Sequence, residues 1–141
     1  MTIQEFAYTK YHVRINDKKL CKKYRIRQHT QPVIYGRYGE IDEDKTYGEV
    51  FVARFLAVPR DANMTGALRN RYKLALAAGL KLKWKGDSES SFHFDPTNEA
   101  QARLVLRLLG VPKRRTLTLT QEQRQAMADR LARGRKARGL R

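Results

Sequence analysis

The sequence predicts an α+β fold: a mostly antiparallel sheet built from two β-hairpins plus a central strand, with two packed helices on one face and a basic C-terminal helix. Three observations predict it. Polarity alternates with the period of a strand over two regions, 5–28 and 80–94. Apolar residues recur with helical spacing after the predicted central strand. The length of 141 residues suits one domain, which we place at 1–111, followed by a basic helix or tail at 112–141.

The first predicted hairpin comes from alternation over 5–15 and again over 20–28. A polar segment at 16–19 has the composition of a turn. In this hairpin one face is apolar and the other is basic. The basic face would present Lys10, His12, Arg14, Lys23, Arg25 and Arg27, with Phe6 and Tyr8 at one end.

The middle of the chain predicts less regular structure. Residues 33–35 suit a short strand, and the acidic run 40–44 reads as a solvated loop. Residues 49–58 are apolar on both parities, which favours a buried strand, although periodicity alone does not exclude a helix. Pro59 ends this run.

A helix is predicted over about 65–78, begun by Asn63 or Thr65 and ended by Gly79. Its buried stripe would be Leu68, Tyr72, Ala75 and Leu76. The second hairpin follows, with strands at 80–85 and 91–94 around a turn at 86–90. Its core-facing side chains would be Leu80, Leu82, Trp84, Phe92 and Phe94.

Two more helices are predicted. Asp95 would cap the first, with Pro96 as its first residue, and Gly110 would end it after Leu109. Its buried stripe would be Ala100, Leu104, Val105 and Leu108. Thr120 and Gln123 have the spacing of a capping box, which predicts a last helix over about 121–137. The apolar stripe of that helix is thin: Met127, Ala128, Leu131 and Ala132.

The net charge is +16, from 30 Lys and Arg against 14 Asp and Glu. So large an excess opposes compaction unless an anionic partner offsets it, and nucleic acid is the usual partner of basic surfaces. No apolar run approaches the length of a membrane span, and the single cysteine, Cys21, excludes an internal disulfide. We therefore expect an intracellular protein that binds nucleic acid, with no membrane association.

Three basic surfaces are candidates for this binding. The first is the outer face of the first hairpin, where Phe6 and Tyr8 would stack on unpaired bases. The second is the row Lys81, Lys83 and Lys85, which equally suits protection of a sheet edge. The third is the C-terminal segment with Lys113, Arg114, Arg115, Arg124, Arg130, Arg133, Arg135, Lys136, Arg138 and Arg141, which is otherwise a solvated tail.

The expected function is binding of phosphate backbone with little sequence preference, in a ribonucleoprotein or a mobile-element complex. RNA is slightly favoured over DNA, because a sheet face with aromatics suits irregular strands. No cofactor, metal or catalytic residue is predicted. Two alternatives stay open: a small metal-dependent nuclease using carboxylates in 40–49, and a basic inhibitor or adaptor that docks on an acidic protein.

Overall fold

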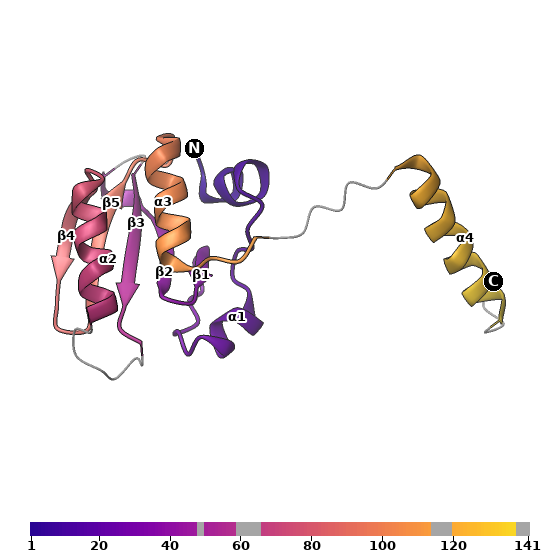
Figure 1. Cartoon of the computed structure of the whole chain (residues 1–141), viewed down its shortest axis with the longest axis horizontal. Helices are drawn as coiled ribbons and strands as arrows, with labels where there is room; N and C mark the ends of the chain where they lie inside the picture. The colour runs from indigo at the N-terminus through magenta and orange to yellow at the C-terminus, as the bar shows by residue number, and fades with distance from the viewer. Residues whose placement is uncertain (48–49, 59–65, 114–119, 138–141) are drawn as a thin grey trace.

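A computed structural model describes residues 1–47, 50–58, 66–113 and 120–137 (Figure 1). Five strands form one antiparallel sheet in the order β1-β2-β3-β5-β4. The strands are β1 (Val33–Gly36), β2 (Gly39–Asp44), β3 (Val50–Leu56), β4 (Lys81–Lys85) and β5 (Glu89–Phe94). The helices are the π-helix η1 (Glu5–Lys10), the 3-10 helix η2 (Lys45–Tyr47), α1 (Lys18–Lys23), α2 (Gly66–Ala77), α3 (Glu99–Leu109) and α4 (Gln121–Ala137).

The α+β class and the antiparallel sheet are confirmed. The sheet contains two hairpins, β1–β2 and β4–β5, with β3 between them. The second predicted hairpin is therefore confirmed, as are the short strand at 33–35 and the buried strand predicted over 49–58, which is β3 over Val50–Leu56. The first predicted hairpin is wrong, because the first hairpin of the sheet lies at 33–44.

Two short helices, η1 and α1, and the loops beside them take the place of that hairpin. The Thr2 hydroxyl accepts a hydrogen bond from the Glu5 amide at 3.1 Å, which favours the turn leading into η1. Asp17 caps α1 by accepting from the Lys19 and Leu20 amides at 2.9 and 3.2 Å. Asp17 therefore begins a helix and is not part of a hairpin turn.

The larger core lies between one face of the sheet and η1, α2 and α3 (Figure 1). Phe51, Phe55 and Phe92 point into it from the strands, and all three are almost fully buried. Gly110, at φ 66°, ends α3 in the left-handed conformation that glycine adopts without strain. Its neighbour Leu109 accepts a hydrogen bond from the Tyr38 amide at 2.9 Å, so α3 is tied to the β1–β2 turn.

A smaller apolar cluster covers part of the opposite face. Cys21 and Ile26, from α1 and the loop after it, pack with Val33 and Tyr35 of β1. The prediction that helices cover one face only is therefore wrong. All four residues of β1 are buried, so both faces of this strand need apolar neighbours. The second cluster supplies them on the face away from the main core.

Several predicted helix details are also wrong. Leu76 of α2 is 44% exposed, whereas Leu68 and Ala75 are buried as predicted. The buried stripe of α3 is Ala102, Val105, Leu106 and Leu109, so of the predicted set only Val105 is fully buried. Asn98, and not Asp95, caps α3, by accepting from the Gln101 amide at 3.2 Å. Asp95 lies three residues before Asn98 and instead accepts from the Thr97 amide. Asn63 and Thr65 lie outside the described residues.

Strand β4 departs from its predicted orientation because its register with β5 is irregular. Leu82 lies opposite Phe92 and Trp84 opposite Ser91, so one extra residue, Lys83, stands between them. Trp84 consequently lies on the sheet face opposite the main core and is 51% exposed, and Leu82, at the edge, is 43% exposed. The prediction that Trp84 faces the core is therefore wrong, whereas Leu82, opposite Phe92, lies on the core-facing side but is not buried.

The last helix is confirmed, together with its capping box. The Thr120 hydroxyl accepts from the Gln123 amide at 3.2 Å, and the Gln123 side chain accepts from the Thr120 amide at 3.0 Å. Met127 and Leu131 are 47% and 60% exposed, and Figure 1 shows α4 apart from the sheet. None of the helices in the described ranges has the length and apolar character that crossing a membrane requires.

Candidate nucleic-acid interface

A dense group of exposed cations lies on α1 and the residues that flank it. We call residues 14–27 the α1 cationic segment. Its exposed cations are Arg14, Lys18, Lys19, Lys22, Lys23, Arg25 and Arg27. Within the part of the chain that the structure describes, Arg14 alone among them forms an ion pair, with Asp17 at 3.1 Å. The segment thus presents unneutralised positive charge to solvent.

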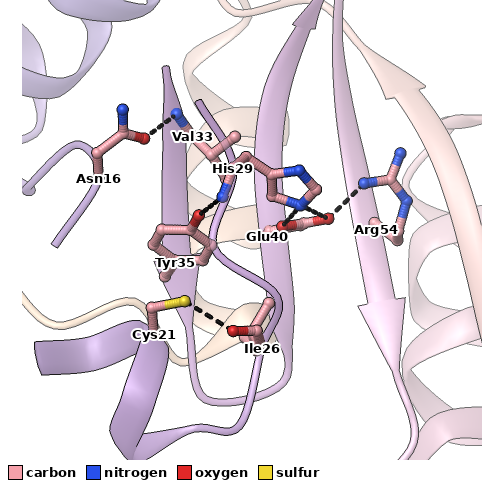
Figure 2. A network of polar contacts seen from close by, with 8 residues as sticks. All are labelled: Asn16, Cys21, Ile26, His29, Val33, Tyr35, Glu40 and Arg54. Carbon is pink, nitrogen blue, oxygen red and sulfur yellow. Dashed lines mark hydrogen bonds and ion pairs between the residues drawn. The ribbon is translucent and has the colours of Figure 1, made fainter. Parts of the chain in front are cut away.

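Figure 2 shows how this segment is fixed to the sheet. Asn16 exchanges two hydrogen bonds with the backbone of Val33, both 2.8 Å long. The Cys21 thiol donates to the Ile26 carbonyl, and the His29 amide donates to the Tyr35 hydroxyl at 2.8 Å. Burial raises the pKa of Cys21, so the thiol stays protonated and able to donate. These contacts hold the segment in one position, which lowers the entropy that it would lose on binding an anion.

Replacing Asn16 by alanine is expected to lower the free energy of unfolding by about 2 kcal/mol. The change leaves the amide of the buried Val33 without its acceptor. It also places alanine at φ 51°, a conformation that asparagine tolerates better. Urea unfolding measures the effect. Asn16→Asp keeps the acceptor and is expected to lose less than half as much, so equal losses in the two variants would contradict this role.

The structure places the residues of the first predicted surface differently. Lys10, His12, Arg14, Lys23, Arg25 and Arg27 are all exposed, but they lie on η1, α1 and loops and not on one hairpin face. Phe6 is fully buried against Phe51 and Phe94, so the prediction that it stacks on bases is wrong. Tyr8 is 48% exposed. Sequence reasoning omitted Lys18, Lys19 and Lys22, although Asp17 before an apolar residue flanked by lysines is a helix-start pattern.

The second surface, Lys81, Lys83 and Lys85, lies on the edge strand β4 and is exposed. Two of the three lysines already have partners within the protein. Lys83 forms an ion pair with Asp44 at 3.1 Å, and Lys85 lies 4.6 Å from the centroid of the Tyr72 ring. Edge protection therefore accounts for this row as well as phosphate binding does.

The third surface is described only in part. Arg114, Arg115, Arg138 and Arg141 lie outside the described residues. Arg124, Arg130, Arg133 and Arg135 are exposed on α4, and Lys113 is exposed after α3. For Lys136, only its place in the helix is described.

The acidic run 40–44 is strand β2 and not a solvated loop, so that prediction is wrong. Ile41 points into the main core, and the carboxyls of Glu40, Asp42 and Asp44 line the opposite face. Glu40 is buried, with His29 at 2.9 Å and an ion pair to Arg54 (Figure 2). Arg54 of β3 and Lys83 of β4 supply cations to this row, at Glu40 and at Asp44.

The other two carboxyls differ in their environment. Asp44 has His93 at 2.8 Å and Lys83 at 3.1 Å, and these contacts lower its pKa from 3.8 to about 2. Burial raises the pKa of Asp42, and one of its oxygens has no hydrogen-bond partner within the described part of the chain. The contacts with His93 and Lys83 thus favour the ionised form of Asp44, whereas burial favours the protonated form of Asp42.

The carboxylates of the nuclease alternative lie on and beside this strand. Asp42, Glu43 and Asp44 line a pocket of about 520 Å³ beside the N-terminal residues, and Glu43 accepts from the Ile3 amide. Glu49 lies outside the described residues. Within 1–47, 50–58, 66–113 and 120–137, no three His, Cys, Asp or Glu side chains are placed to hold one metal ion.

The fold and its basic surface define a small α+β protein with a cationic segment fixed to its sheet. The chain matches no protein-family model, no curated protein and no solved structure. Its function is therefore argued from its own residues.

Proposed function

We propose that this protein binds nucleic acid through the phosphate backbone, with the α1 cationic segment as the principal surface and with little sequence preference. The observation that carries the proposal is the group of seven exposed cations at 14–27, fixed to the sheet and almost free of acidic partners among the described residues. Such a group releases counterions when phosphates replace them, which favours binding without reading bases. The row at 81–85 and the basic helix α4 would add contacts of the same kind.

The nucleic acid is not specified further. The preference for RNA rested on aromatics exposed on a sheet face, and Phe6 is buried. RNA and DNA are therefore both proposed, and membership of a ribonucleoprotein or mobile-element complex stays a prediction.

Neutralising Lys19, Lys22 and Lys23 together by glutamine is expected to weaken binding of a fluorescent single strand about tenfold at moderate salt. It should also reduce the slope of log affinity against log salt by about 2, since each lost phosphate contact removes about 0.7. Fluorescence anisotropy over a salt series measures both. The matched control neutralises Lys45, Arg69 and Lys73, which are exposed cations outside the proposed surfaces.

Equal losses in the two triple variants would contradict the assignment of the surface, because net charge alone would then account for binding. No retention of RNA or DNA at low salt would contradict the proposed function. In that case, binding to an acidic protein would favour the adaptor alternative.

A further inference from the structure

A pocket of about 320 Å³ lies between the N-terminal segment and α3, on a part of the molecule that the α1 cationic segment does not use. Figure 1 shows the N-terminal turns, in indigo, beside α3, in orange. The chain that leaves α3 completes the wall. The lining residues are Tyr11, Val13, Arg103, Leu106, Arg107, Val111 and Lys113.

The floor of the pocket is apolar and its rim is cationic. Tyr11, Val13 and Leu106 are buried side chains of the core, whereas Arg103 and Arg107 are exposed on α3. Burial raises the pKa of Tyr11, so its phenol stays neutral near neutral pH. None of the lining residues in the described chain is acidic. This combination suits a ligand with a flat apolar body and an anionic end.

The cations of the rim have different positions. The Arg103 guanidinium lies 5.6 Å from the Tyr11 ring centroid, and its Nε donates to Glu99 at 2.7 Å, so this side chain is fixed as a wall. Arg107 follows one helical turn later on the same face of α3. Neither Arg107 nor Lys113 forms an ion pair with any described residue. These two cations are available to an incoming anion.

The size of the pocket limits what enters it. Its volume is at the lower end of the roughly 300 to 1,000 Å³ found for small-molecule sites. A single aromatic base fits this volume, and a folded polymer does not. A phosphate matches an arginine beside a lysine, because arginine binds two oxygens at once and lysine adds a point charge.

We propose that this pocket binds a nucleoside monophosphate, with the base on the floor of Tyr11, Val13 and Leu106 and the phosphate between Arg107 and Lys113. The nucleotide is either free or the phosphorylated end of a strand. If the nucleotide is the end of a strand, the inference rests on the proposed function. If it is a free nucleotide, the inference is independent of that function.

Titration of the full-length protein with adenosine monophosphate, followed by amide chemical shifts, tests the site. Adenosine monophosphate is expected to bind at least about fivefold more tightly than adenosine or inorganic phosphate, because only it reaches both floor and rim. Arg107→Gln and Lys113→Gln are each expected to weaken it by about five- to tenfold. Arg69→Gln, on α2, is the matched control and should change nothing. Equal binding of adenosine and its monophosphate, or no effect of Arg107→Gln, would overturn the proposal.

Two forms of one short single strand, with and without a terminal phosphate, distinguish the two sources of the nucleotide. Tighter binding of the phosphorylated strand, lost in Arg107→Gln, assigns the pocket to a strand end. Equal binding of both strands, with adenosine monophosphate still sensitive to Arg107, assigns it to a free nucleotide. If strands bind but adenosine monophosphate does not, the pocket proposal alone fails. If adenosine monophosphate binds but no strand does, the proposed function alone fails.

Discussion

Replacing Phe6 by alanine is expected to destabilise the protein by about 3 to 5 kcal/mol, the largest effect of any single change considered. The Phe6 ring is fully buried, and its centroid lies 4.6 Å from that of Tyr11 and 5.3 Å from that of Phe51. Removing it leaves a cavity where η1 meets the sheet, and the loss of aromatic contacts adds to the lost burial. The substitution would also remove the ring that packs against Tyr11, and Tyr11 lines the pocket beside α3.

Urea unfolding near neutral pH measures this loss. Tyr8→Ala is the matched control, because Tyr8 lies two residues away on the same helical turns and is 48% exposed. Its expected cost is below about 1 kcal/mol. A stable Phe6→Ala variant with weakened binding of single strands would contradict the structure, since that pattern is expected only if Phe6 stacks on bases.

The second large effect concerns Asp44, whose contribution to stability depends on pH. Its pKa in the folded protein is about 2, below the ordinary 3.8, chiefly because His93 hydrogen-bonds the carboxylate and Lys83 lies beside it. A lowered pKa means that the folded state binds a proton less readily than the unfolded state. The contribution is therefore fully present above pH 3.8 and is lost as the pH falls toward 2.

Asp44→Asn is expected to cost roughly 1 to 2 kcal/mol near neutral pH, a discounted figure because Lys83 is 40% exposed and solvent screens the pair. Urea unfolding of both proteins across the acidic range measures the difference between them. That difference should shrink as the pH falls below 3.8. Glu5→Gln, at an exposed carboxylate, serves as the control, with little effect at any pH. A constant difference between wild type and Asp44→Asn would contradict the role of the ionised carboxylate.

The same two residues show where sequence reasoning reached its limit. Phe6 belongs to a segment whose alternation also fits a helical turn that buries Phe6, Ala7 and Tyr11. Periodicity over so few residues does not separate these cases, although Thr2 and Glu5 have capping-box spacing. The acidic neighbours of Asp44 predict a loop. The side chains that hold Asp44 in the sheet are Lys83 of β4 and His93 of β5, which lie 39 and 49 residues away in the chain, and no local pattern reveals them.

For the binding surface, the sequence showed that the segment before residue 28 is rich in lysine and arginine. These basic side chains are exposed in the structure, as expected. It did not show which of them share a surface, because that depends on whether the segment is a hairpin or a short helix. The sequence does not predict the pocket beside α3, since its lining residues come from opposite ends of the domain.

The sequence alone determined the α+β class, the β4–β5 hairpin, the buried strand β3 and the helices α2, α3 and α4. Each has a local cause: alternation, an uninterrupted apolar run, or helical spacing closed by a cap or a glycine. Tertiary structure decided what covers the ends of the sheet. The helices η1 and α1 take the place of the predicted strands: η1 packs in the main core, and α1 with the loop after it gives β1 apolar cover on the opposite face. Tertiary structure also placed the acidic run in strand β2, where Arg54 and Lys83 form ion pairs with Glu40 and Asp44, and His93 hydrogen-bonds Asp44.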